Sequence, residues 1–166
     1  MSISTEKYVL LTGSDLGNRE SNLALALELI QKRLDQQCRT SEIMETEPWG
    51  FNSETRFLNQ AILITTELAP EQLLKEILKI EVEIGRVREK TQWVSRMIDI
   101  DILCAENLIH HTVNLVIPHV QLHHRSFALN PLCQLAGHWN HPHFGKTYAQ
   151  LNTEVNQSIV SNSRIA

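Results

Sequence analysis

Two aspartates, Asp99 and Asp101, alternate with isoleucines in the stretch 98–102. Residues two apart project from the same face of a β-strand, so this pattern predicts a strand with one apolar face and one face that carries both carboxylates. At a rise of about 3.3 Å per residue the two acids begin roughly 7 Å apart, within reach of one or two hard divalent cations. The pattern favours a divalent-metal site, although a polar outer face is also the ordinary state of many sheets.

Basic residues gather immediately before this strand, at Arg86, Arg88, Lys90 and Arg96, with Glu89 as the one acid among them. The chain as a whole is acidic, with a formal charge of −4 at pH 7. Basic side chains in a loop are often simply solvated. Neighbouring carboxylates, however, repel each other unless a cation lies between them, so a basic loop beside an acidic strand predicts a ligand that brings phosphates and magnesium together.

Length and composition limit the class of protein. The 166 residues, of which 42% are apolar, predict a single globular domain over residues 1–166, with 158–166 as a frayed tail. The acidic balance argues against a general binder of nucleic acid or of anionic membranes, and no apolar run approaches the ~18 residues of a membrane span. Three widely separated cysteines predict free thiols and a reducing compartment, so we expect a cytoplasmic protein. We also expect a monomer that acts on small molecules.

The elements that position the acids follow from the hydrophobic periodicity. An apolar run over 7–12 predicts a buried strand, and Asn18 is placed to cap the helix that follows the turn 13–18. The order of elements is β-α-β-β-α-β, which is the ferredoxin-like order, so we predict an α+β fold with an antiparallel sheet and helices packed on its faces. The further expected elements are strands over 40–47, 57–68 and 98–104 and helices over 70–84, 125–135 and 147–155.

Three features leave alternatives open. The loop 48–56 contains Trp49 and Phe51, which either cover a planar ligand or cap the core. The turn 13–17 lacks the spacing of a P-loop or of a dinucleotide-binding turn, so it is a weak phosphate motif. His138, His141 and His143 lie in a loop without the cysteines or the helical register of a zinc site, which disfavours metal binding there.

Taken in series, the motifs of this chain resemble those of the 6-hydroxymethyl-7,8-dihydropterin pyrophosphokinase family. Enzymes of that family transfer the pyrophosphoryl group of ATP to a pterin hydroxymethyl group in folate biosynthesis. Each motif is weak alone, but their collinear order over roughly residues 7–140 is specific. The motifs are Gly13–Gly17, Thr46–Pro48, Phe57–Asn59, Gly85–Arg88, Trp93, Arg96–Leu103, Pro118–His119 and Arg125–Leu132.

The resemblance implies roles for individual residues. Asp99 and Asp101 would hold two Mg²⁺ ions that bridge the phosphates of ATP, with Arg86 and Arg96 as further catalytic residues. A flat pterin would stack between Phe57 and Phe127, and its polar edge would be recognised by Asn59 and the backbone near Thr46 and Pro48. The nucleotide would be surrounded by Glu81, Arg88, Trp93, Ile100, His119 and Arg125, with Trp93 on a loop that closes over the site. The implied reaction is in-line attack of the pterin hydroxyl on the β-phosphorus, with release of AMP.

The chain departs from the family pattern at Asp15, where asparagine is usual, and at Val94-Ser95, where Gly-Pro is usual. These changes bear on loop behaviour more than on the type of reaction. Two rival functions are a non-catalytic ferredoxin-like module that senses a small anion through its arginines, and a nucleotidyltransferase that releases pyrophosphate. Magnesium dependence of nucleotide binding separates the first rival, and the identity of the released nucleotide separates the second.

Overall fold

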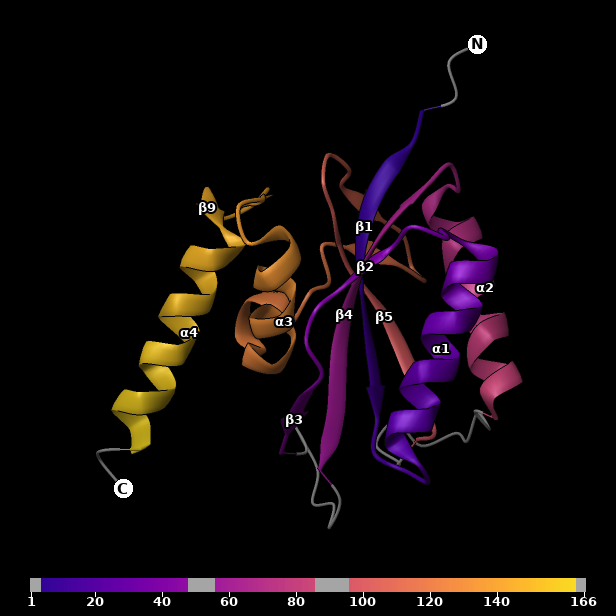
Figure 1. The fold of residues 1–166 in the computed structure, drawn as a ribbon. Helices are drawn as coiled ribbons and strands as arrows, with labels where there is room; N and C mark the ends of the chain where they lie inside the picture. The colour runs from indigo at the N-terminus through magenta and orange to yellow at the C-terminus, as the bar shows by residue number, and fades with distance from the viewer. Residues whose placement is uncertain (1–3, 48–55, 86–95, 164–166) are drawn as a thin grey trace.

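An antiparallel sheet of strand order β2-β4-β1-β5, with β3 paired to β4, lies at the centre of the molecule (Figure 1). The structure is a computed structural model that describes residues 4–47, 56–85 and 96–163. Strand β1 pairs with β4 on one side and with β5 on the other, and every pairing in the sheet is antiparallel. The strands are β1 (Glu6–Ser14), β2 (Arg39–Thr40), β3 (Met44–Thr46), β4 (Phe57–Thr66) and β5 (Asp99–Ala105).

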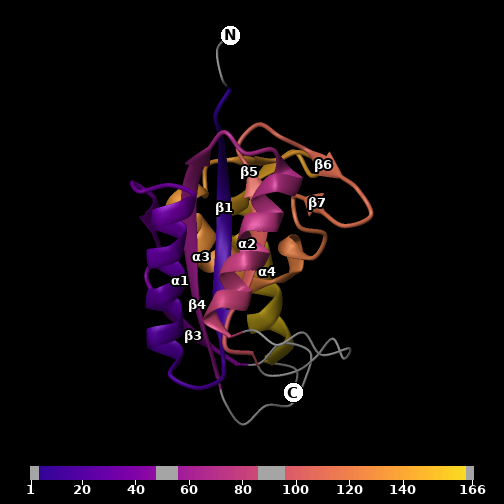
Figure 2. The same ribbon diagram turned by 90° about the vertical axis from the view of Figure 1, so that its right-hand side faces the viewer.

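Helices cover both faces of this sheet. The helices α1 (Arg19–Arg33) and α2 (Pro70–Ile84) lie side by side on one face, while α3 (Ser126–Ala136) and α4 (Tyr148–Ser163) form the layer on the other (Figures 1 and 2). This arrangement confirms the predicted α+β fold. None of the helices in the described ranges is long and apolar enough to span a membrane. The smaller elements are β6 (His110–His111), β7 (Val116–Ile117), a 3-10 turn over Leu122–His124, β8 (Asn140–His141) and β9 (Lys146–Thr147).

Local signals set the helix ends where the sequence predicts them. The side chain of Asn18 caps α1 by accepting a hydrogen bond from the backbone N–H of Ser21 at 2.9 Å. Pro70 occupies the first turn of α2, where its missing N–H costs nothing. Gly85 ends α2 in the left-handed conformation, at φ 109°, which a residue with a side chain adopts only with strain.

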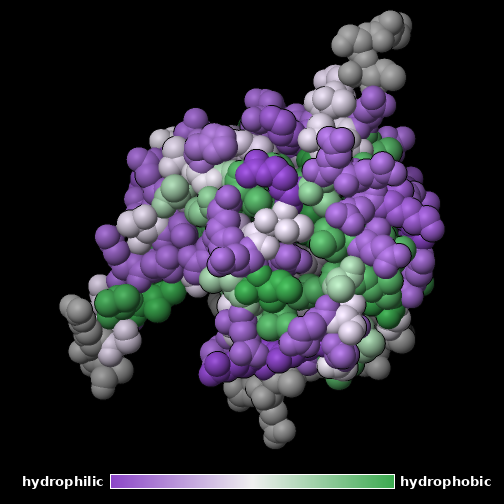
Figure 3. Space-filling model, viewed as in Figure 1, coloured by the Kyte–Doolittle hydropathy of each residue, from purple (hydrophilic) through white to green (hydrophobic). Residues whose placement is uncertain are grey.

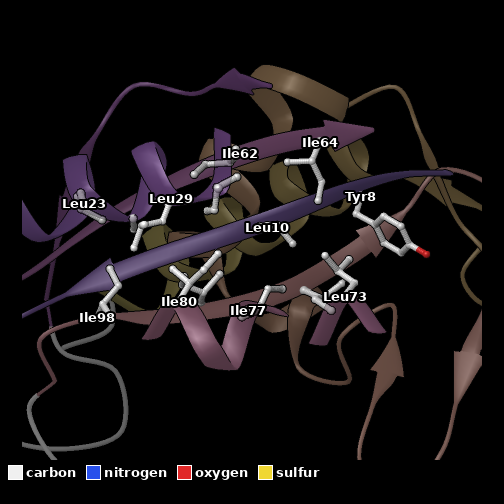
Figure 4. Packing of buried hydrophobic residues seen from close by; sticks show 14 of the residues in the cluster. Tyr8, Leu10, Leu23, Leu29, Ile62, Ile64, Leu73, Ile77, Ile80 and Ile98 are labelled. Carbon is white, nitrogen blue, oxygen red and sulfur yellow. The ribbon is translucent and has the colours of Figure 1, made fainter. Parts of the chain in front are cut away.

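Two apolar clusters lie on opposite faces of the sheet. The first fills the space between the sheet and the helices α1 and α2 (Figure 4). The second lies between the sheet and α3 and α4, and includes Val9, Leu11, Ala61 and Leu129. Because successive residues of a strand project to opposite faces, membership of a cluster shows which way each strand residue points. The labelled members of the first cluster in Figure 4 are Tyr8, Leu10, Leu23, Leu29, Ile62, Ile64, Leu73, Ile77, Ile80 and Ile98.

The structure differs from the predicted elements in two places. The strand expected over 40–47 is divided into β2 and β3 by Ser41, which is buried between them. The hydroxyl of Ser41, and not a backbone carbonyl, accepts the hydrogen bond from the N–H of Ala61 at 2.9 Å, so the regular β-ladder is interrupted there. The last helix continues to Ser163, beyond the predicted end at residue 155 and into the segment expected to be frayed.

Candidate active site

Strand β5 presents its two aspartates to the α3 side of the sheet. Ile98, Ile100 and Ile102 are at most 4% exposed and belong to the cluster under α1 and α2. Asp99 and Asp101 therefore project from the opposite face, and both are half-buried. The alternation predicted from the sequence, with an apolar face and a carboxylate face, is present in the structure.

Gly13, near the end of β1, lies between the acids and a buried amide. It pairs with Asn59 of β4 on one side and with Asp99 of β5 on the other, so the three residues form one row on one face of the sheet. Because glycine has no side chain, the row contains an amide, a gap and a carboxylate. A Cβ atom at residue 13 would lie 3.1 Å from Asn59 Oδ1 and 3.8 Å from Phe57 Cδ1, so both side chains border this gap.

The amide of Asn59 is held in one orientation. Its Nδ2 donates to Thr46 Oγ1 at 2.7 Å, and the side chain is 4% exposed. The carbonyl oxygen is the atom that faces Gly13, where it offers an acceptor to the N–H groups of a ligand lying on the glycine. Three predicted pterin contacts, Thr46, Phe57 and Asn59, thus come together at one end of the sheet.

Cationic side chains surround the two aspartates. The guanidinium of Arg96 donates from Nη1 to Asp99 Oδ2 at 3.1 Å. Burial lowers the pKa of Arg125, and the nearby carboxylates of Asp101 and Asp99 oppose that shift. A guanidinium in a protein is effectively always charged. Arg125 also lies over the ring of Phe127 in the first turn of α3, with 5.8 Å between the guanidinium carbon and the ring centroid.

His119 is a neutral hydrogen-bond donor beside this group. Burial and then the charge of Arg125 lower its pKa to about 4, against a raising effect from Asp99. Its Nδ1 accepts a hydrogen bond from the backbone N–H of Gln121 at 3.2 Å, so the proton of the neutral ring is on Nε2. The backbone N–H of His119 donates to the carbonyl of Leu103 at 2.8 Å, which fixes the residue against β5.

Glu81 and Ile100 lie behind the acidic face. Glu81 is 1% exposed, and its Oε1 accepts from the backbone N–H of Ile100 at 2.8 Å, on the edge of β5 that pairs with no other strand of the sheet. Ile100 is the residue between the two aspartates, and its side chain is in the core. The structure therefore places Glu81 where it fixes the backbone that carries both acids.

The remaining predicted site residues, Pro48, Arg86, Arg88 and Trp93, lie outside the described residues. One residue of the site, Gly13, was recognised in the sequence only as part of a turn. A glycine inside a strand is the available signal, because it often marks a close approach of a ligand or of another backbone. Figure 3 shows an apolar area, ringed by hydrophilic side chains, beside α3 and β4.

Comparison with known proteins now separates the alternatives. The family model of 7,8-dihydro-6-hydroxymethylpterin-pyrophosphokinase (HPPK) matches residues 9–137. The chain belongs to the HPPK family. It is a transferase of folate biosynthesis that moves the pyrophosphoryl group of ATP to the hydroxymethyl group of 6-hydroxymethyl-7,8-dihydropterin, with release of AMP.

Curated HPPK relatives cover most of the chain. A 2-amino-4-hydroxy-6-hydroxymethyldihydropteridine pyrophosphokinase of Porphyromonas gingivalis is 40% identical over 135 residues, which are 78% of this chain and 90% of that protein. The enzyme of the same name from Bacillus subtilis is 38% identical over 129 residues, 77% of this chain and 76% of that protein. The family match over residues 9–137 extends over the strands β4 and β5 and the helix α3 that carry the candidate site.

Solved structures support the fold. An HPPK-DHPS structure in complex with substrates superimposes with a TM-score of 0.75 over 94% of this chain, at 18% identity. A Plasmodium falciparum HPPK-DHPS structure with STZ-DHP gives 0.76 over 98% of this chain, at 17% identity. This chain spans less than half the length of either protein, 44% and 45%, so the likeness concerns the HPPK fold alone.

We expect Gly13→Ala to weaken the binding of the dihydropterin to this HPPK. The added Cβ would meet Asn59 Oδ1 at 3.1 Å and would occupy the gap in the row. Displacing one hydrogen-bond acceptor and a stacked ring costs roughly 1.4 kcal/mol, which corresponds to about a tenfold higher KM for the pterin. Steady-state kinetics at saturating ATP measure it. Gly145→Ala in the β8–β9 hairpin is the control for a general loss of stability: its φ of 61° strains alanine, but its Cβ meets nothing within 4 Å, so Tm should fall while the pterin KM stays at the wild-type value. An unchanged pterin KM in Gly13→Ala would contradict the assignment.

Within the histidine-rich segment of this HPPK, His141 is packed inside the protein, whereas His138 and His143 are exposed. No group of three or more His, Cys, Asp or Glu in the described ranges is arranged to hold a metal ion. His141 is 4% exposed, its Nδ1 accepts from the backbone N–H of His143 at 3.2 Å, and its ring lies against Phe144 and Tyr148 at centroid distances of 4.5 and 5.6 Å. Burial, and then the neighbouring His143 and His123, lower the pKa of His141 to about 4.

Acid should therefore destabilise the protein partly through His141. The pKa of His141 is about 4 in the folded state and 6.5 in the unfolded state. Between pH 6.5 and about 4 the unfolded state therefore binds more protons than the folded state, and the free energy of unfolding decreases as the pH falls through this range. From pH 7 to pH 5 this residue should remove on the order of 1–2 kcal/mol from the free energy of unfolding. We expect urea unfolding of His141→Gln to show a smaller loss over this range. His111→Gln, at an exposed position in β6 away from His141, should keep the wild-type loss.

Proposed function

We propose that the two substrates of this HPPK meet along the row formed by Asp99, Gly13 and Asn59. The dihydropterin lies on Gly13 between Phe57 and Phe127, with its polar edge at Asn59 and its hydroxymethyl group toward Asp99. The triphosphate of ATP lies over Asp99 and Asp101. The observation that carries the proposal is the strand register, because Gly13 alone separates the amide of Asn59 from the carboxylate of Asp99 in one row of the sheet.

The acids fit a magnesium site. Mg²⁺ is commonly held by one or two carboxylates, with substrate phosphates and water as the other ligands. Asp99 and Asp101 offer two carboxylates on one face, and no larger group of metal ligands is found in the described part of the chain. We propose that they hold two Mg²⁺ ions, which when bound neutralise the phosphate oxygens and orient the transferred group.

The cationic residues complete the proposed site. Arg96 and Arg125 offset the negative charge of the triphosphate, and the neutral ring of His119 donates from Nε2 to a phosphate oxygen. Glu81 keeps the backbone between the two acids in place through its bond to Ile100. Arg86, Arg88, Trp93 and Pro48 are proposed contacts on the resemblance alone.

Positioning and charge neutralisation account for the proposed catalysis. The hydroxymethyl oxygen of the pterin forms a bond to the β-phosphorus and releases its proton to solvent, while the bond from that phosphorus to the oxygen of the α-phosphate breaks, so AMP leaves. The row of Asp99, Gly13 and Asn59 holds the attacking oxygen near the β-phosphorus, so the two substrates react in a fixed orientation and not in a random encounter. The guanidinium groups stabilise the charge on the equatorial phosphate oxygens without forming a covalent intermediate.

We further propose that the chain works as a cytoplasmic monomer with one domain, and that it binds neither nucleic acid nor membranes. The described cysteines, Cys38, Cys104 and Cys133, are free thiols, as expected in a reducing compartment. The net charge of −4 argues against a broad anionic partner.

The decisive assay incubates the protein with ATP, magnesium and 6-hydroxymethyl-7,8-dihydropterin, and identifies the released nucleotide. AMP is expected, in an amount equal to that of the pterin pyrophosphate formed. A pterin that lacks the hydroxymethyl group is the control and should release no AMP. Release of pyrophosphate would instead indicate a nucleotidyltransferase, and binding of nucleotide without turnover would indicate a sensor.

A further inference from the structure

Asp15 lies directly after β1, and its carboxylate is buried at 1% exposure. Its Oδ1 accepts a hydrogen bond from the backbone N–H of Arg96 at 2.6 Å. In the reverse direction, the backbone N–H of Asp15 donates to the carbonyl oxygen of Arg96 at 3.3 Å. Within the described part of the chain, Oδ2 of Asp15 has no hydrogen-bond partner. Both of these hydrogen bonds join Asp15 to a single residue, Arg96, which lies 81 positions along the chain.

These two bonds fix both polar groups of the Arg96 backbone. With its N–H and its carbonyl both held, the direction in which the Arg96 side chain leaves the chain is set. That side chain ends at Asp99, where Nη1 donates to Oδ2 at 3.1 Å. A continuous path of hydrogen bonds thus connects Asp15 through the backbone and side chain of Arg96 to Asp99.

The turn that carries Asp15 is itself anchored from the opposite face of the sheet. Asn22 of α1 donates from Nδ2 to Ser14 Oγ at 3.1 Å and to the carbonyl of Leu16 at 2.9 Å. These bonds hold the residues on both sides of Asp15 and leave its carboxylate to face Arg96. Burying a carboxylate lowers stability unless its oxygens are paired, and in the described part of the chain the one partner of this side chain is the backbone N–H of Arg96.

We propose that Asp15 is a positioning residue for Arg96, which acts on the reaction through the direction of the guanidinium and not through contact with either substrate. The inference rests on the catalytic role proposed for Arg96. A displacement of about 1 Å in a group that stabilises a transition state lowers the rate by up to ~10²-fold, so the anchor matters far more for turnover than for binding.

Two variants of Asp15 test the first part of this inference. Asp15→Ala removes the acceptor, and we expect kcat to fall by at least ~10-fold, while KM for ATP and for the pterin changes by less than ~3-fold. Asp15→Asn keeps an oxygen at the position of Oδ1, and we expect it to restore kcat to within ~3-fold of the wild type.

If Asp15→Ala is unfolded at the assay temperature, Asp15→Ser replaces it, since its hydroxyl is one bond shorter and cannot reach the N–H of Arg96. A purely structural residue would lower Tm in these variants and leave kcat of the folded enzyme unchanged, and that result would overturn the proposal.

A double-mutant cycle with Arg96→Ala tests whether Asp15 acts through Arg96. In the Arg96→Ala background, Asp15→Ala should change kcat by less than ~2-fold, because the group it positions is gone. Multiplicative losses in the double variant would show that Asp15 acts independently of Arg96, which refutes the inference while the proposed function stands. An Arg96→Ala enzyme with wild-type kcat would instead show that the catalytic role of Arg96 is wrong.

Discussion

Replacement of Asp99 and Asp101 together by asparagine will lower kcat by at least ~10³-fold, since the site loses its charged metal ligands at once and metal ions contribute several kcal/mol to phosphate transfer. Asparagine keeps the size of each side chain, and both positions are half-buried on the polar face of β5, so the core formed by the intervening Ile100 is unaffected. The loss should therefore occur in a folded protein with a nearly unchanged Tm.

Nucleotide binding should change in opposite directions with and without magnesium. In the wild type the two carboxylates repel a free triphosphate, Asp99 is paired with Arg96, and the charges of Asp101 and Asp99 act on Arg125. The Asp99→Asn/Asp101→Asn variant should thus bind magnesium-free ATP more tightly than the wild type does, and ATP with magnesium at least ~10-fold more weakly. Isothermal titration with ATP, once with excess magnesium and once with a chelator, gives both dissociation constants.

The control for this variant removes two carboxylates elsewhere. Glu76→Gln/Glu154→Gln disrupts two ion pairs, with Lys79 and with Lys146, on α2 and α4. It produces the same change in net charge, so both dissociation constants should remain near their wild-type values. Nucleotide affinity that is the same in the aspartate variant and in the control would refute the metal site and favour an anion sensor that relies on arginines alone.

Local sequence signals predicted the elements that position the site. The Ile/Asp alternation on β5, the cap at Asn18 and the end of α2 at Gly85 all depend on residues close together in the chain, and the structure has each of them. The division of β2 from β3 was missed because it depends on the bonds of Ser41 to β4, a strand that begins many residues later. The length of α4 was missed because its last turns are exposed and, apart from Ile159 and Val160, polar, so they show no clear apolar period.

The arrangement of the site depends on register, which sequence spacing does not supply. Asn59 and Asp99 belong to strands that do not pair with each other, and they share a row only because both pair with Gly13. A shift of one residue in either pairing would move the partner side chain to the other face of the sheet. The contact between Asp15 and Arg96 has the same origin, since it exists only after β1 and β5 have paired.

Arg96→Ala should lower kcat by ~10²–10³-fold while it weakens ATP binding by less than ~10-fold. In this structure the Arg96 guanidinium is paired with Asp99, and both side chains are more than a quarter exposed, so the pair itself contributes at most about 1 kcal/mol. A phosphate contact in the ground state has to compete with Asp99 for the same donors, which limits what Arg96 adds to ATP binding. In the transition state, charge on the phosphate oxygens is rearranged. The Arg96 guanidinium is already directed at the two aspartates, so it stabilises this charge without further reorganisation.

Single-turnover rates and equilibrium titration with a non-reactive ATP analogue separate the two quantities for Arg96→Ala. Arg33→Ala is the control, because it removes an arginine that is paired with Glu83 between α1 and α2. Arg33→Ala should change neither quantity, since that ion pair lies on the helices under the opposite face of the sheet. Equal losses of rate and of affinity in Arg96→Ala would place the contribution of Arg96 in ground-state binding. In that case the Asp15 variants, like Arg96→Ala, should lower nucleotide affinity and rate by the same factor.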